Sequence, residues 1–222
     1  MEPSNLESLY KSFGTQAANF ESNKYHLSKK EYVDYAIKKS EPKKSDKLLE
    51  VAAGTCILGR AFSKYVAQVT CLDVTTAMLE IGKKESEKEN INNIIFVKGF
   101  AENLPFLDNS YDIVISRLAF HHFSNPIPIF AEMKRVLKDN GKLILIDMIP
   151  RDISLRDEID RIETIRDNSH VRELSLEEMT KLYNDNNLKL EIQESNEIPV
   201  DLESWMELTK TPEDSRKNIR QI

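Results

Sequence analysis

Short apolar runs alternate, along the middle of the chain, with longer segments in which apolar residues recur at helical spacing. Short aliphatic and β-branched runs are typical of buried strands, whereas apolar positions three or four residues apart indicate amphipathic helices. The predicted strands cover residues 47–52, 68–73, 94–98, 111–116 and 142–147. Because strands that alternate with helices are joined by right-handed crossovers, the pattern predicts an α/β fold with a mostly parallel, doubly wound sheet and helices on both faces.

The helices predicted between these strands cover residues 58–65, 76–90 and 127–137, with lengths that suit crossover connections. Thr75 or Thr76 is expected to cap the second of these helices. Asn140 and Gly141 predict a tight turn before the fifth strand, because both residue types adopt turn conformations readily.

The flanking regions are predicted to be largely helical. Residues 1–40 are polar but interleaved with tyrosines and phenylalanines, which suggests helices that pack on the sheet and cap a site. Downstream, helices are expected at residues 154–166, 175–186 and 202–209, a strand at 188–198, and a short charged helix at 212–222.

Composition narrows the classes of function. The 222-residue chain carries a formal net charge of -6, which argues against a protein that binds by neutralising nucleic-acid phosphates or anionic lipids. Its two cysteines, Cys56 and Cys71, lie in apolar segments, which suits a reducing compartment. The N-terminus shows no basic-then-apolar leader, and no apolar run reaches the roughly 18 residues of a spanning helix. We therefore expect a cytoplasmic protein with no membrane or nucleic-acid partner.

The chemistry is expected at the carboxyl ends of the predicted strands, where open parallel sheets bind their ligands. The first strand-to-helix loop contains Ala52, Ala53 and Gly54, small residues that let the backbone approach a ligand, although a tight turn alone would explain them equally well. Asp73 ends the next strand 19 residues after Gly54, about the spacing of an acid that binds ribose hydroxyls. Its alternative role is to cap the helix near Thr76. Together these signals favour a nucleoside-binding site.

Two other kinds of nucleotide site fit the loop poorly. A dinucleotide fingerprint needs glycine where this chain has Ala52 and Cys56, and a P-loop needs Lys followed by Ser or Thr after its second glycine. Here Arg60 and Ala61 follow Gly59. The pattern therefore disfavours an NTPase, and it gives little support to a nicotinamide-dependent oxidoreductase.

A set of motifs along the chain points to one family. The motifs cover residues 48–54, 72–79, 99–106, 108–112 and 135–138. Together they resemble those of class I S-adenosylmethionine-dependent methyltransferases of the ubiquinone/menaquinone-biosynthesis (type 11) group, and residues 117–123 are similar to an Arg-x-x-x-His-His-Phe signature of bacterial members. The resemblance, which extends over about residues 10–200, implies a Rossmann-like fold and methyl transfer from S-adenosylmethionine to a small molecule.

The resemblance also assigns roles along the cofactor site. It implies that Glu50 orders the cofactor loop, that Gly54 lets the methionyl part pass close to the backbone, and that Asp73 takes the ribose hydroxyls. It places Met78 against the adenine. The other cofactor-binding positions that it implies are Ala52, Val74, Ala101 and Glu102, the last two along the adenine edge, and Arg117 and Leu118 on the methionine side.

The chain departs from the family pattern in the first motif, at the adenine position and near its end. Ala52 and Cys56 replace outer glycines of the first motif, and Phe100 stands where an Asp often binds the adenine amino group. After Thr209 only a short charged segment follows, so either the final strand of the sheet is missing or the sheet closes differently. We expect one methyltransferase domain over residues 1–222, with an N-terminal helical cap at 1–45, the cofactor-binding core at 46–150 and substrate-side helices at 151–222.

His121 and His122, which follow the fourth predicted strand, are the candidate catalytic residues. Methyl transfer from a sulfonium mainly requires alignment in a dry pocket, because the leaving group needs no acid. If the acceptor is a hydroxyl or an acidic carbon, either imidazole can take its proton; alternatively, one ring packs and the other faces solvent. No metal site is predicted, because His26 and His170 share no ligand-like spacing with this pair.

The walls of the substrate pocket are expected from the aromatic N-terminal segment and from residues 151–186. The altered first motif and Phe100 leave a second interpretation open, in which the chain is a non-catalytic module that binds the cofactor or its nucleoside product. The nicotinamide-dependent oxidoreductase is the third alternative.

Overall fold

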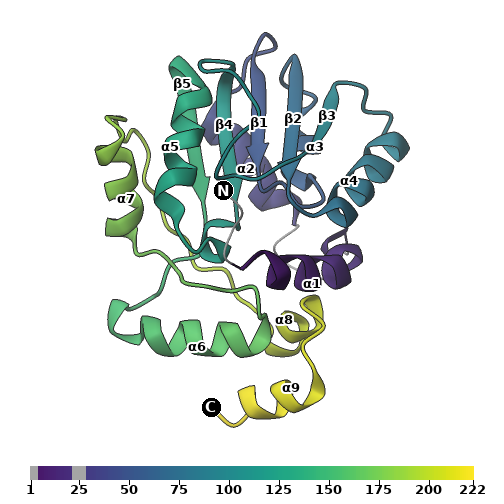
Figure 1. The fold of residues 1–222 in the computed structure, drawn as a ribbon, viewed down its shortest axis with the longest axis vertical. Helices are drawn as coiled ribbons and strands as arrows, with labels where there is room; N and C mark the ends of the chain where they lie inside the picture. Colours follow the sequence, from purple (N-terminus) through teal and green to yellow (C-terminus); the bar gives the residue numbers. More distant parts are fainter. Residues whose placement is uncertain (1–4, 22–28) are drawn as a thin grey trace.

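Five parallel strands form the centre of the computed structural model, which describes residues 5–21 and 29–222 (Figure 1). In their order across the sheet, the strands are β3 (Ile94–Lys98), β2 (Gln68–Asp73), β1 (Lys47–Val51), β4 (Tyr111–Arg117) and β5 (Leu137–Ile146). Every neighbouring pair is parallel. The order reverses between β1 and β4, so the carboxyl ends of these two strands flank the point at which such sheets bind ligands. The predicted fold class is confirmed.

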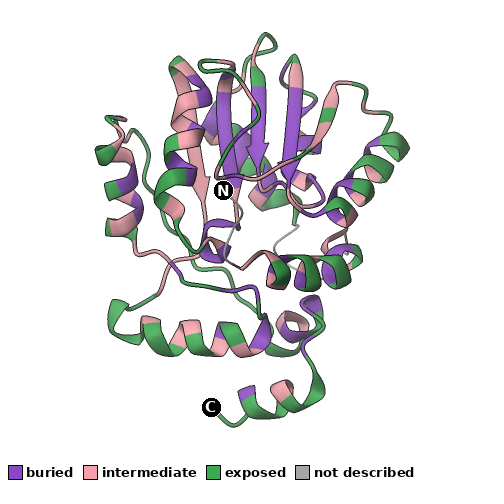
Figure 2. Ribbon diagram, viewed as in Figure 1, coloured by how far each residue is buried: buried purple, intermediate pink, exposed green. Residues whose placement is uncertain are grey.

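Successive residues of the central strands belong to different hydrophobic cores. Leu48 packs with α2 (Lys30–Ser40) and α3 (Ile57–Phe62), whereas Leu49 packs with α5 (Pro126–Val136) and α7 (Leu176–Asp185). This alternation follows from the two-residue period of a strand, which sends neighbouring side chains to opposite faces. Figure 2 shows the result, since β1, β2 and β4 are almost entirely buried and the outer strands are less so. The remaining crossover helix is α4 (Thr76–Lys88).

A second group of helices lies beyond the carboxyl ends of the strands (Figure 1). It comprises α1 (Leu6–Gln16), η1 (Ala17–Glu21), η4 (Ile153–Leu155), α6 (Arg156–Arg166), α8 (Leu202–Leu208) and α9 (Glu213–Ile219). Segments from the two ends of the chain meet here, because the Asn19 side chain donates hydrogen bonds to the carbonyls of Glu207 and Leu208 at 3.1 and 3.0 Å. These helices therefore cover the edge of the sheet at which a ligand is expected.

The prediction of a strand at residues 188–198 is wrong. Leu188, Leu190 and Ile192 alternate as in a strand, but the segment is irregular and residues 191–200 are all exposed. A strand is stabilised by a partner ladder and by one buried face, and this segment has neither. No strand follows β5 within the described residues, which corresponds to the first of the two alternatives for the end of the sheet, that the final strand is missing.

The predicted turn before the fifth strand and the predicted cap of α4 also differ in detail from the structure. β5 begins at Leu137, directly after α5, and the predicted turn lies inside it, where Asn140 has φ +64. At this left-handed residue the pairing of β5 with β4 shifts in register, between Tyr111 and Ile113 of β4. Thr75 is the N-cap residue of α4, but its side chain makes no capping hydrogen bond.

Phe130 tests the core between the sheet and α5. Its side chain is fully buried, whereas Ile127 on the same helix is 63% exposed. We expect Phe130→Ala to lower the free energy of unfolding by roughly 3–5 kcal/mol, because it removes buried contacts and leaves a cavity. Ile127→Ala is the control and should change it by less than about 0.5 kcal/mol. Urea unfolding followed by circular dichroism measures both, and equal losses would contradict the packing described here.

Candidate active site

Glu50, at the carboxyl end of β1, fixes the first helix of the site. Its buried carboxylate accepts a hydrogen bond from the Gly59 N–H at 2.8 Å. A Cβ on residue 59 would lie 2.7 Å from the Cys71 sulfur and 2.8 Å from the Glu50 carboxylate, so α3 approaches the sheet this closely only with glycine there. Burial raises the pKa of Glu50 to about 7, although the Gly59 hydrogen bond and the charge of Arg117 oppose the shift.

The loop between β1 and α3 alternates left-handed backbone conformations. Ala52, Gly54 and Cys56 have φ of +53, +54 and +60. This region is strained by about 1–2 kcal/mol for residues that carry a Cβ. The loop therefore keeps the shape of a glycine-rich turn at the two positions where the sequence lacks glycine. A Cβ on Gly54 would meet nothing within 4 Å, so the space beside its Cα is open.

Asp73, at the carboxyl end of β2, connects this loop to the next helix. One carboxylate oxygen accepts from the Gly54 N–H at 2.8 Å, and the other accepts from the Thr75 N–H at 2.7 Å. Burial raises the pKa of Asp73, and the backbone hydrogen bonds from Thr75 and Gly54 oppose that shift. Asp73 thus holds the start of α4, as the capping alternative predicts, and it also lines the pocket described below.

Asp147 organises the loop after β4 from the end of β5. Its carboxylate accepts hydrogen bonds from the N–H groups of Phe120, His121 and Met148 at 2.6, 3.2 and 2.7 Å. It also pairs with Nδ1 of His121 at 2.5 Å, and both side chains are buried. Burial by itself lowers the pKa of His121, but the Asp147 carboxylate outweighs it, and the net shift is upward.

His122 has a different environment. Its Nδ1 lies 3.2 Å from the Ser169 hydroxyl, which donates to Asp167 at 2.6 Å, and Asp167 in turn accepts from Gln16 at 3.2 Å. Phe13 of α1 contacts the ring edge-on, with 5.0 Å between the ring centres. Burial and the neighbouring charge of His121 lower the pKa of His122 to about 3. His122 is therefore a neutral ring that joins α1 and the end of α6 to the core.

All the predicted site residues line one pocket at the carboxyl edge of the sheet. They are Glu50, Ala52, Gly54, Asp73, Val74, Met78, Ala101, Glu102, Arg117, Leu118, His121 and His122. The pocket extends beyond them to a second set of walls, which come mostly from the helices over this edge and from the segments that adjoin them. Those walls include Leu9, Phe13, Phe20, Phe123, Met148, Arg166, Asp167, Val200, Trp205, Leu208 and Thr209. We call the two parts the strand-end half and the helix half.

Three residues near the pocket were not among the predicted site residues: Asp147, Arg166 and Trp205. The only sequence signal for Asp147 was its place at the end of a predicted strand, which it shares with Asp73. Arg166 and Trp205 lie on different helices, and their contact, with the guanidinium carbon 4.6 Å from the ring centre, arises only in the folded molecule.

Neither a metal cluster nor a membrane span is found in the described residues. No group of at least three His, Cys, Asp or Glu side chains among them is arranged to hold a metal ion. None of their helices is long and apolar enough to cross a bilayer. His170 instead pairs with Asp160 at 2.7 Å, and His26 falls outside the described residues.

Comparison with known proteins places this site in a family. A methyltransferase domain model matches residues 49–145. The methyltransferase YcgJ of Bacillus subtilis is 35% identical over 184 residues, which cover 82% of this chain and 73% of that protein. Its crystal structure aligns with a TM-score of 0.81 over 86% of this chain and 82% of that one. A putative methyltransferase structure from Bacillus halodurans aligns with a TM-score of 0.81 at 26% identity, over 84% of this chain and 81% of that one.

The relationship extends to a quinone-biosynthesis enzyme. The ubiquinone/menaquinone biosynthesis C-methyltransferase UbiE of Shewanella pealeana is 36% identical over 105 residues, 46% of this chain and 42% of that protein. The chain belongs to the methyltransferase family, and it is an S-adenosylmethionine-dependent methyltransferase. The predicted family, enzyme class and cofactor are confirmed, which sets aside the nicotinamide-dependent and non-catalytic alternatives.

Stability should depend on pH through Glu50. The pKa of this carboxyl is about 7 in the folded protein against 4.5 in the unfolded chain, so between these values the folded state holds the proton more tightly. The stability that the protonated form contributes is complete below pH 4.5 and is lost as the pH rises to about 7. Glu50→Gln keeps an oxygen for the Gly59 N–H but does not titrate.

We therefore expect the stability of the wild type, relative to Glu50→Gln, to fall by roughly 3 kcal/mol as the pH rises across this range. Urea unfolding of both proteins at half-unit pH steps measures the difference. Two parallel stability curves would show that burial does not raise this pKa.

Proposed function

We propose that this enzyme methylates a small organic molecule in the cytoplasm. The observation that carries the proposal is the division of one pocket into a strand-end half with polar groups and a helix half with mostly apolar and aromatic walls. Residues 46–150 would hold the cofactor, and the helices before and after them would hold the acceptor. Cys56 and Cys71 are free and buried, which is consistent with a reducing compartment.

The strand-end residues suit the parts of S-adenosylmethionine. In this proposal the Asp73 carboxylate accepts hydrogen bonds from the ribose hydroxyls, and the open space beside Gly54 admits the methionyl chain. Val74, Met78 and Ala101 give an apolar slot for the adenine, with Glu102 at its edge. Arg117 and Leu118 face the methionine end, where a guanidinium suits a carboxylate. When bound, the cofactor supplies an electrophilic methyl group on sulfur.

His121 is the residue we assign to the acceptor's proton. Asp147 occupies Nδ1 of His121, so Nε2 is the nitrogen that is left to take a proton in its neutral form. The carboxylate also stabilises the imidazolium that results, as in other buried acid–histidine pairs. His122 is a poor base by comparison, because its pKa is about 3. We therefore propose that His121 acts in proton transfer and that His122 positions the surrounding helices.

Calorimetric titration with S-adenosylmethionine and S-adenosylhomocysteine tests the cofactor site. We expect micromolar binding of both ligands, no competition from NAD, and at least a tenfold loss of affinity in Asp73→Ala, which removes the proposed ribose ligand. Failure of both sulfur ligands to bind would refute the proposed site. Unchanged affinity in Asp73→Ala would refute the role of Asp73.

Proton NMR of the histidine ring signals tests the His121–Asp147 pair without an acceptor. In the S-adenosylhomocysteine complex, the His121 signal should titrate above 6.5, and Asp147→Asn should lower this midpoint by at least about one unit. The His122 signal should not titrate between pH 5 and 8. The His121→Gln variant assigns the signal, and a His121 midpoint that is unchanged by Asp147→Asn would contradict the pairing.

A further inference from the structure

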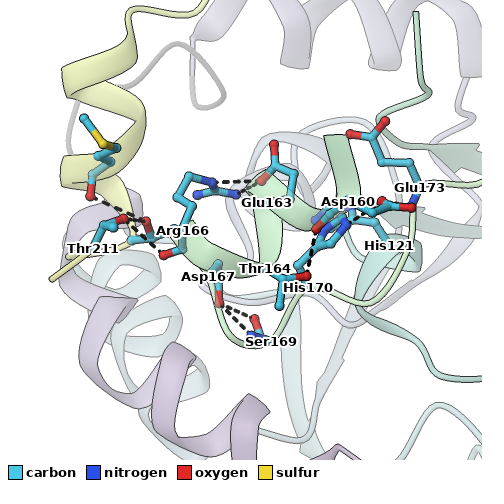
Figure 3. Close-up of polar contacts among 12 residues, drawn as sticks. His121, Asp160, Glu163, Thr164, Arg166, Asp167, Ser169, His170, Glu173 and Thr211 are labelled. Atoms are coloured by element: carbon cyan, nitrogen blue, oxygen red, sulfur yellow. Dashed lines mark hydrogen bonds and ion pairs between the residues drawn. The ribbon is translucent and has the colours of Figure 1, made fainter. Parts of the chain in front are cut away.

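Arg166 is a buried cation in the wall of the helix half of the pocket. It lies in the last turn of α6, and its side chain is 7% exposed. Its Nε and Nη2 both donate to one carboxylate oxygen of Glu163, at 2.8 and 2.7 Å. Figure 3 shows the guanidinium directed at Glu163, one turn earlier on the same helix.

Two further contacts hold Arg166 in place. Trp205 of α8 lies against the guanidinium, with 4.6 Å from the guanidinium carbon to the ring centre, a cation–π arrangement. The backbone carbonyl of Arg166 accepts from the Thr211 hydroxyl at 3.1 Å. The cation is thus oriented by groups from α6, from α8 and from the segment before α9, so little further ordering is needed to use it.

Part of the guanidinium remains available. Nη1 makes no hydrogen bond to any residue that the structure describes, and it is not among their fully buried unpartnered atoms. Arg166 lines the pocket, so Nη1 is the part of the guanidinium that a ligand there can use. The neighbouring Asp167 makes no hydrogen bond to the guanidinium, because its carboxylate is directed toward Ser169 (Figure 3) and accepts from Ser169 and Gln16.

A contribution to the stability of the fold does not by itself explain why the Arg166–Glu163 pair is buried here. A buried Arg–Glu pair is often no more stable than apolar residues of the same volume, because two charges lose their hydration. Most of the helix half is built from apolar side chains, including Phe13, Phe20 and Leu208, and its other polar members are Asp167 and Thr209. A fixed cation in a mostly apolar wall is instead what an anionic ligand group requires, since a planar guanidinium binds a carboxylate or phosphate strongly.

We propose that Arg166 is the acceptor anchor, so that the methyl acceptor has an apolar, ring-sized body and one anionic group, a carboxylate in preference to a phosphate. The inference rests on the proposed function of the same pocket. The apolar walls hold the body of the acceptor, and Arg166 and His121 line the same pocket. An acceptor bound at Arg166 therefore extends toward the proposed proton acceptor. A carboxylate fits because Glu163 already accepts from the Nε and Nη2 edge of the guanidinium, which leaves Nη1 for a small planar anion.

Matched pairs of small acids and amides test the proposal in protein saturated with S-adenosylhomocysteine. The probes are benzoate, phenylacetate and indole-3-acetate, each with its amide, and phenyl phosphate as the second kind of anion. By calorimetry, we expect at least one acid to bind at least tenfold more tightly than its amide, and phenyl phosphate to bind more weakly than that acid. Tighter binding of phenyl phosphate than of every acid would overturn the preference for a carboxylate and would indicate that the anionic group of the acceptor is a phosphate. Equal binding of acids and amides, or no binding of any acid, would overturn the proposal.

Variants test whether the preference for acids over amides depends on Arg166. Arg166→Met combined with Glu163→Leu removes the pair without leaving a buried unpaired charge, and we expect it to reduce the acid preference below twofold. Arg156→Gln is the matched control, because Arg156 also lies on α6 and pairs with Glu178 at 2.7 Å but does not line the pocket. An acid preference that survives in the double variant would overturn the proposal. S-adenosylhomocysteine affinity in every variant distinguishes this failure from a failure of the cofactor site.

Discussion

Buried carboxylates at the ends of strands hold the active-site loops in place, and the pocket depends on them. Glu50, Asp73 and Asp147 lie at or just beyond the carboxyl ends of β1, β2 and β5, and each accepts at least one backbone N–H from a loop or helix start nearby. A charged carboxylate is costly to bury unless such donors surround it, so each acid is stable only with its loop in the observed position. The parallel sheet brings the three together because all its strands end at one edge.

At this carboxyl edge of the sheet, the adjacent residues His121 and His122 have different environments and therefore different roles. His121 is paired with Asp147, whereas His122 is neutral and hydrogen-bonded toward Ser169. Their ring centres lie 4.1 Å apart, so charge on one opposes charge on the other. This coupling explains how two residues of one type, next to each other in the chain, take a proton-transfer role and a positioning role in our account. His122 and its neighbours form one of the connections between the core and the helix half of the pocket, in which Arg166 lies against Trp205.

Sequence patterns predicted the sheet well because its three central strands are buried on both faces and therefore read as continuous apolar runs. They failed at residues 188–198, where Leu188 and Ile192 alternate with polar residues but no neighbouring strand exists to pair with them. The cofactor-side residues were accessible to motif comparison because they lie in short, contiguous loops. Asp147, Arg166 and Trp205 were not, since their roles come from contacts across distant segments that no local spacing records. The left-handed conformations of Ala52 and Cys56 explain why glycine is expected at those positions, and they show that the loop shape survives its replacement.

A crystal structure of the enzyme with S-adenosylhomocysteine tests the central claim, that strand-end carboxylates form the cofactor site in advance. The account predicts ribose hydroxyls within hydrogen-bonding distance of the Asp73 carboxylate, while Asp73 keeps its bonds to the Gly54 and Thr75 N–H groups. The homocysteine end would lie at Arg117 and Leu118. A nucleoside bound elsewhere, or an Asp73 that must release either N–H group to bind it, would contradict the account.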